Sequence, residues 1–66
     1  MDLIMEILGL STMTHNFFLR AGARTLMDVA DICNGKRSKK NIPEKCIREA
    51  QEALKLQEPF LGVKLL

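Results

Sequence analysis

The pattern of apolar and polar positions predicts a helix, a tight corner and a second helix between residues 11 and 31. Ser11 is a suitable N-cap for the first helix, because its hydroxyl can accept a hydrogen bond from a free backbone N–H of the first turn. Over residues 12–21, a helical wheel separates an apolar arc from a polar one. The apolar arc holds Met13, Phe17, Phe18 and Ala21, and the polar arc holds His15, Asn16 and Arg20.

The corner between the two helices has its own signals. Gly22 is the residue type that most often takes the left-handed conformation at a helix end. Thr25 and Asp28 have the spacing of a capping box, with Asp in place of the usual Glu or Gln. We therefore expect a second helix after Thr25, and its apolar face carries Leu26, Val29 and Ala30.

A third helix is predicted after a basic loop. Asn34-Gly35 is a strong stop signal. Pro43 suits the first turn of the next helix, where its missing N–H costs nothing, and Pro59 is expected to close that helix. Ile47, Ala50 and Leu54 share its apolar face, with Cys46 and Ala53 at the edge. The opposite face, expected to be solvated, holds Lys45, Arg48, Glu49, Glu52 and Lys55.

Both ends of the chain are apolar. Residues 1–10 form a lead-in with about one helical turn, expected to lie across the core, and residues 60–66 are expected to return and cover it. No sustained two-residue alternation indicates a strand. We expect an all-α fold, with residues 1–66 forming a single domain of four to five short helices. The predicted core includes Phe18, Leu26, Ile47 and Leu54.

Composition excludes several classes of protein. The apolar start is too short and too interrupted by Asp2 and Glu6 to span a membrane, and it lacks the basic region of a signal peptide. Cys33 and Cys46, with a single histidine, cannot make a four-ligand zinc set. Two reduced cysteines in a cytoplasmic protein are the simpler interpretation.

No catalytic constellation is evident in the sequence. His15 has no obvious nucleophile or acid partner, and no glycine-rich phosphate loop follows a strand. A chain of 66 residues also has little room for a substrate cleft. We expect a binding domain that is not an enzyme, with no cofactor, no metal and no small-molecule substrate.

The loop before the third helix concentrates positive charge. The net charge of the chain is only +2, so the placement of the charge matters more than its sum. Two interpretations stand: a solvated loop that keeps a small protein soluble, or a patch that faces phosphates. The basic residues are Lys36, Arg37, Lys39 and Lys40.

Three stretches, in order, resemble the C-terminal domain of the bacterial RNA polymerase alpha subunit. They are LGLSTMTHNFFLRAGARTLMDV, NIPEKCIREAQEAL and the ending LGVKL. Shared positions include Ser11, Asn16, Thr25, Asp28 and Lys45. The resemblance covers nearly the whole chain, and it implies a compact helical domain with a helix-hairpin-helix-like unit. Members of that family bind the minor groove of A·T-rich promoter DNA and contact transcription activators and sigma factor, so the expected partners are A·T-rich DNA and a transcription factor or polymerase subunit.

The family's DNA-facing positions fall on Met13, Asn16, Phe17, Pro43, Lys45, Cys46 and Glu49. Met13 stands where the family has a groove-binding arginine, and Pro43 stands where it has a glycine that permits close backbone approach. A basic loop also replaces a short helix of the family. The candidate DNA-binding residues are therefore Asn16, Lys45, Cys46 and Glu49 together with the loop residues Lys36, Arg37, Lys39 and Lys40.

A second hypothesis follows from the same departures. Met13 and Phe17 form an apolar pair where a base-reading arginine belongs. Exposed apolar patches commonly mark partner surfaces. The domain is then a protein-interaction module that keeps the fold and has lost minor-groove binding.

Overall fold

The computed structural model describes residues 3–66, and these contain three α-helices. They are α1 (Thr12–Arg20), α2 (Leu26–Cys33) and α3 (Glu44–Leu61), preceded by one 3-10 turn, η1 (Met5–Leu8). Within residues 3–66 there is no strand, only a single bridge between Ile4 and Thr25. The helical class is confirmed, although the elements are three α-helices and one 3-10 turn rather than four or five helices. Met1 and Asp2, part of the predicted lead-in, lie outside the described residues.

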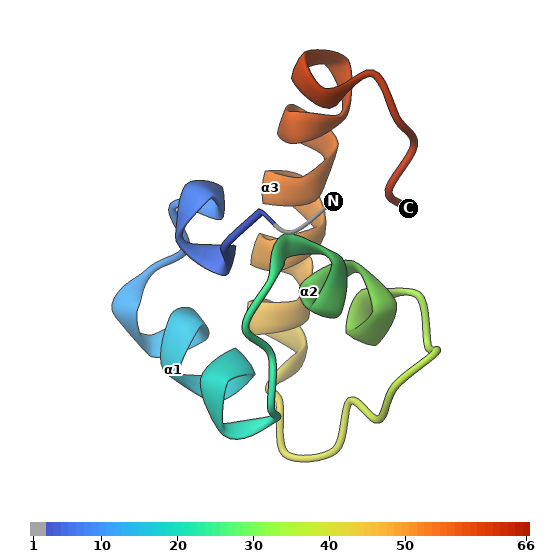
Figure 1. Cartoon of the computed structure of the whole chain (residues 1–66). Coiled ribbons are helices and arrows are strands. Elements are labelled where there is room, and N and C mark those ends of the chain that lie inside the picture. Colours follow the sequence, from blue (N-terminus) through green and yellow to red (C-terminus); the bar gives the residue numbers. More distant parts are fainter. Residues whose placement is uncertain (1–2) are drawn as a thin grey trace.

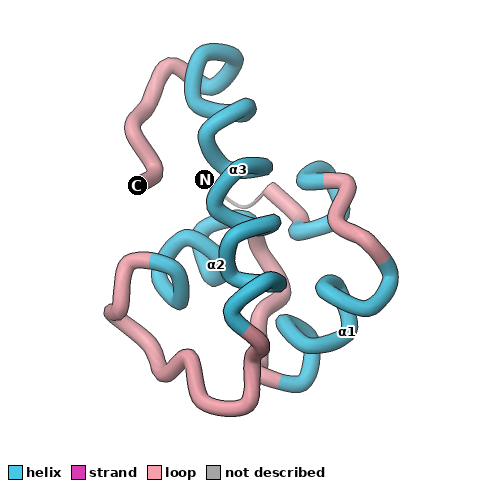
Figure 2. The backbone as a smooth tube through the Cα atoms, turned by 180° about the vertical axis from the view of Figure 1, so that it is seen from behind, coloured by secondary structure: helices cyan, strands magenta, loops and turns pink. Residues whose placement is uncertain are grey.

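The long helix α3 is the axis of the molecule, and η1, α1 and α2 pack against its first half (Figure 1). The loop after α2 crosses one end of the molecule to reach the start of α3, as the opposite view also shows (Figure 2). The last turns of α3 project beyond the other elements at the opposite end. The basic loop and the end of α3 therefore lie at opposite poles.

The predicted caps of the first two helices are confirmed. The Ser11 hydroxyl accepts a hydrogen bond from the Thr14 N–H at the start of α1. Thr25 and Asp28 form a complete capping box at the start of α2, each side chain accepting from the other's backbone N–H. Gly22 has φ +93°, so it takes the left-handed conformation that the corner requires.

The prediction that Pro59 ends the third helix is wrong, because Pro59 lies inside α3. A proline there removes one backbone hydrogen bond near the helix end, a loss that the last turn tolerates. The helix ends two residues later at Leu61. The next residue, Gly62, has φ +69° and donates its N–H to the Glu58 carbonyl. At the other end, Pro43 is the N-cap residue rather than the first helical residue.

The core contains the four residues predicted for it, since Phe18, Leu26, Ile47 and Leu54 are all buried. On α1, however, the inward-facing residues are Thr14 and Phe18, whereas the wheel favoured Met13. The Thr14 hydroxyl donates to Glu49 at 2.6 Å, so a polar residue can be fully buried there. Met13 is instead 45% exposed.

Both apolar ends of the chain contribute to the core, as predicted, although Phe60 and Val63 of the C-terminal stretch are exposed. Met5 and Leu8 of η1 are buried, and the Met5 N–H donates to the Arg24 carbonyl at 3.1 Å. Leu65 of the returning tail is buried. The Glu58 carboxylate accepts from the Leu65 N–H at 2.6 Å and so fastens the tail to α3.

Both cysteines are free and buried, and burial raises the pKa of the Cys33 thiol to about 11. Cys46 is fully buried within the core, although the sequence placed it at the edge of the apolar face. No helix within residues 3–66 has the length and apolarity needed to cross a membrane.

We expect Phe18→Ala to lower the free energy of unfolding by about 3–5 kcal/mol, the usual range for truncating a buried aromatic side chain. Phe60→Ala makes the same chemical change at a residue that is 85% exposed, so it should change stability by less than about 0.5 kcal/mol. Urea denaturation of the two variants beside the parent measures both values. Equal effects from the two substitutions would contradict the assigned core.

Candidate nucleic-acid interface

Charge is unevenly distributed along the chain. Residues 20–48 contain eight of the ten basic residues and only three of the eight acidic ones, a net charge of +5 against −3 for the rest. This segment includes the α1–α2 corner, α2, the basic loop and the start of α3. The basic loop and the start of α3 meet at one pole (Figure 1). Positive charge is therefore concentrated in this segment, which includes the basic pole, rather than spread over the chain.

Three of the four loop cations are free to meet a ligand, and one is not. Lys36, Lys39 and Lys40 are exposed. Arg37 is partly buried, with its guanidinium 3.1 Å from the Asp28 carboxylate and a second nitrogen donating to the Ala21 carbonyl at 3.4 Å. Arg37 thus fixes the loop to the α1–α2 corner, a structural role that the sequence did not indicate.

Asp28 collects several donors at this corner. Its carboxylate accepts from the N–H groups of Arg24 at 2.8 Å and Thr25 at 3.0 Å and pairs with Arg37. The two backbone hydrogen bonds, from Arg24 first and then Thr25, are the main reason that the pKa of Asp28 lies below its usual value. The charged form is therefore the one that holds the corner and the loop together.

The start of α3 lies beside this loop. Lys45 is exposed in the first turn, and no side chain caps the helix. Free N–H groups at a helix start carry partial positive charge, which favours anions. Pro43 contributes no N–H, so the donors begin at Glu44. Asn16 is exposed on α1.

Two of the predicted DNA-binding side chains are engaged within the fold. The Cys46 side chain is fully buried, so it cannot contact a duplex. The Glu49 carboxylate accepts from the Thr14 hydroxyl at 2.6 Å, from the Ser11 N–H at 2.6 Å and from the Ser11 hydroxyl at 3.0 Å. These hydrogen bonds, the one from Thr14 first, lower the pKa of Glu49. Glu49 therefore fastens α3 to the start of α1, and it is half-buried there rather than fully solvated.

The proposed partner surface is partly exposed. Met13 is 45% exposed, and Phe17 is half-buried between the core and the solvent. The Arg20 guanidinium lies 5.8 Å from the centre of the Phe17 ring, within the range of a cation–π contact. Phe17 is therefore held beside a positive charge rather than in a purely apolar patch.

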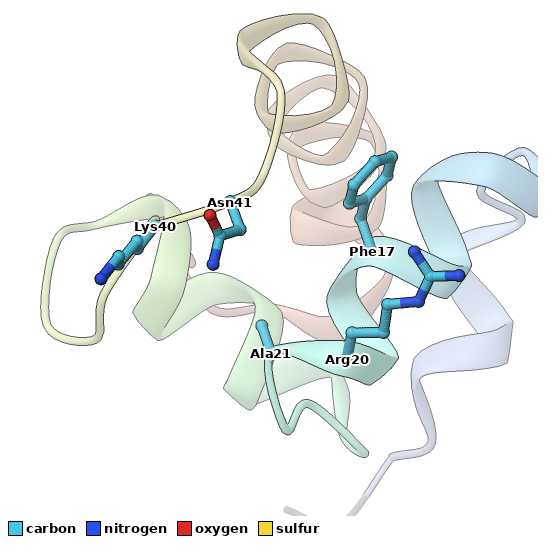
Figure 3. A pocket seen from close by; sticks show the side chains of 5 residues that line it. All are labelled: Phe17, Arg20, Ala21, Lys40 and Asn41. Carbon is cyan, nitrogen blue, oxygen red and sulfur yellow. The ribbon is translucent and has the colours of Figure 1, made fainter.

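A depression between α1 and the loop brings together residues that sequence analysis did not combine. It has a volume of about 200 Å³ and is lined by Phe17, Arg20, Ala21, Lys40 and Asn41 (Figure 3). Asn41 has φ +69°, the one positive value at a non-glycine residue within residues 3–66. The three-residue spacing of Phe17 and Arg20 is the signal that could have shown them to be neighbours on α1. No such local spacing brings Lys40 and Asn41 of the loop next to them, because that contact depends on the fold.

His15 also has a partner that the sequence did not reveal. Its Nε2 lies 3.8 Å from the carboxylate of Glu6, a residue of η1. Within residues 3–66, no three His, Cys, Asp or Glu side chains are grouped so that they can hold a metal ion. Among the described residues, the polar side chains therefore form hydrogen-bonded helix caps and the basic pole rather than a metal site.

Comparison of the chain with protein-family models, with curated proteins and with solved structures found no match.

The Glu49 carboxylate should make the fold sensitive to acid. Because its folded pKa is lowered, Glu49 stabilises the fold above its ordinary pKa of 4.5, and this contribution disappears as the pH falls from there through the folded pKa. We expect the melting temperature of Glu49→Gln to fall less steeply than that of the parent over that interval. Glu52→Gln, at an exposed position of the same helix, is the control and should leave the pH profile unchanged. Identical profiles for Glu49→Gln and the parent would contradict the assigned role.

Proposed function

We propose that this domain is a non-catalytic, transcription-related module of the same kind as the polymerase alpha C-terminal domain, with a helix-hairpin-helix-like unit. In this proposal it binds A·T-rich double-stranded DNA, a transcription factor or polymerase subunit, or both, in the cytoplasm. The observation that carries the DNA-binding part is the basic pole, where Lys36, Lys39, Lys40 and Lys45 are all exposed.

The resemblance supports the fold and the function to different degrees. Ser11, Thr25 and Asp28, three of the shared positions, are capping residues, so they account for the shared helix boundaries. Asn16 and Lys45 are exposed and have no capping role, so the functional part of the resemblance depends on them. In this proposal Asn16 meets the groove edge and Lys45 meets a phosphate.

Affinity for DNA arises mainly from phosphate contacts in the absence of a groove-binding arginine. Each lysine that neutralises a phosphate releases counterions, which makes binding weaker as salt rises. Arg37 does not contribute, because its charge is balanced by Asp28. Glu49 stays charged, and its carboxylate is bound to Ser11 and Thr14, so it holds the fold together and adds nothing to the attraction for phosphates.

The alternative function is protein interaction through Met13 and Phe17. It is favoured by the 45% exposure of Met13 on α1, where the resemblance places an arginine. A methionine side chain adapts to irregular apolar surfaces and is common at binding interfaces. In this alternative the domain keeps the fold while the apolar pair binds a transcription factor or polymerase subunit.

Titration with an A·T-rich duplex, followed by amide chemical shifts, distinguishes the two functions. DNA binding predicts shifts at Asn16, at Lys45 and along the loop at residues 36–41. The protein-interaction module predicts no saturable shifts with DNA. Saturable shifts confined to the opposite pole, near Phe60, would contradict both assignments.

The salt dependence of duplex affinity should identify the contacting lysines. Replacing Lys39 or Lys40 with Gln should lower the slope of log affinity against log salt by about 0.9 for each phosphate that the lysine neutralises in the parent. Lys64→Gln is the matched control, because Lys64 is exposed in the tail and lies outside the basic segment. Fluorescence anisotropy at a series of salt concentrations measures the slopes. A slope that responds equally to all three substitutions would contradict a localised interface.

Met13→Arg should restore groove binding if α1 faces DNA as the resemblance implies. A narrow A·T minor groove has enhanced negative potential, which favours arginine over a neutral side chain. We expect higher affinity for A·T-rich duplex and a new preference over G·C-rich duplex. Because Met13 is 45% exposed, the melting temperature should change little. A well-folded variant with no gain in duplex affinity would count against this orientation and favour the protein-interaction module, whose partner binding the new charge should weaken.

A further inference from the structure

The depression between α1 and the loop combines an aromatic ring, a guanidinium, an ammonium group and an amide. It is lined by Phe17, Arg20, Ala21, Lys40 and Asn41. Its volume of about 200 Å³ is below the roughly 300–1,000 Å³ typical of small-molecule sites. It therefore suits one flat group that belongs to a larger ligand better than it suits a complete metabolite.

We propose that this depression binds an unpaired base of a single-stranded nucleic acid, which stacks on Phe17 while its phosphates meet Arg20 and Lys40. The inference deepens the proposed function, because it uses the same basic pole. It adds a ligand class, the unpaired base, that a duplex-binding surface does not require.

The arrangement of the side chains supports a base rather than a simple anion. Phe17 and Asn41 come from opposite sides of the depression, one from α1 and the other from the loop, with Ala21 between them (Figure 3). Alanine is small enough to leave this space open. Asn41 carries an amide, which can donate to and accept from a base edge. An anion alone needs neither the ring nor the amide.

Arg20 and Lys40 line the depression from opposite sides (Figure 3). Arg20 lies against the Phe17 ring, 5.8 Å from its centre, and the Lys40 side chain extends outward from the loop (Figure 3). Lys39 is exposed next to Lys40 in the loop. A strand that inserts one base therefore has positive charge on both sides for the flanking phosphates, the usual combination in proteins that bind single strands.

The fold fixes the positions of the two sides of the depression relative to each other. Arg37 donates to the Ala21 carbonyl and pairs with Asp28, so the loop is attached to the end of α1. Asn41 keeps its left-handed conformation, φ +69°, which Asn tolerates better than most residues do. The depression is therefore formed before a ligand arrives.

The test compares a twelve-nucleotide oligo-dT with a twelve-nucleotide abasic strand of the same charge, by fluorescence anisotropy at fixed salt. We expect oligo-dT to bind about 5- to 140-fold more tightly, the range for stacking one base on an aromatic side chain. Phe17→Leu, which keeps an apolar side chain and loses the ring, should abolish the difference, and Phe17→Tyr should retain it. Phe60→Leu, at the exposed phenylalanine of the opposite pole, should leave it unchanged.

Equal affinity for the two strands would overturn the inference, and so would equal losses from Phe17→Leu and Phe60→Leu. Binding of a poly-glutamate peptide as tight as that of oligo-dT would also overturn it, in favour of recognition by charge alone. The A·T-rich duplex titration is a separate measurement. Duplex binding without a preference for oligo-dT over the abasic strand would refute the base site and leave the proposed function standing.

Discussion

The Asp28 carboxylate is the interaction on which the basic pole depends. It accepts the N–H groups of Arg24 and Thr25, completes the cap of α2 and pairs with Arg37 of the loop. One side chain thus joins the corner, the second helix and the loop. A loop with four cations repels itself, and the pairing of Arg37 removes one of these charges while fixing the course of the chain. The depression beside Phe17 exists because the loop is held there.

Glu49 has the corresponding role on the other side of α1. Its carboxylate meets three donors from Ser11 and Thr14, so the start of α1 is attached to α3 by charge-assisted hydrogen bonds as well as by the burial of Phe18. A domain of 66 residues has a small core, and such polar attachments fix the direction of a short helix that apolar contacts alone leave free to rotate. Residues that look like surface charges in the sequence are therefore structural.

Local signals in the sequence predicted most of the fold. The Ser11 cap, the Thr25–Asp28 capping box and the left-handed Gly22 depend on neighbours within a few residues, and all three are present. Interactions across long sequence separations were not predictable in this way. The partners of Glu49 and Arg37 come from other elements. A helical wheel therefore assigns Glu49 to solvent, and the composition of the loop does not reveal the partner of Arg37. The wheel also favoured Met13 over Thr14, because it cannot show that a carboxylate satisfies the buried hydroxyl.

The same geometry explains why α1 can carry a binding function without endangering the fold. Thr14 and Phe18 hold the helix against the core, whereas Met13 and Phe17, one residue earlier in each case, lie at the margin. A substitution at Met13 changes an exposed side chain of α1 and leaves the buried Thr14 and Phe18 in place. Since core and surface functions are assigned to adjacent positions, the helix can present an arginine, a methionine or an aromatic ring on one unchanged scaffold. In the proposed function, the ligand is thus selected by residues at the edge of the core, whereas the buried residues maintain the fold.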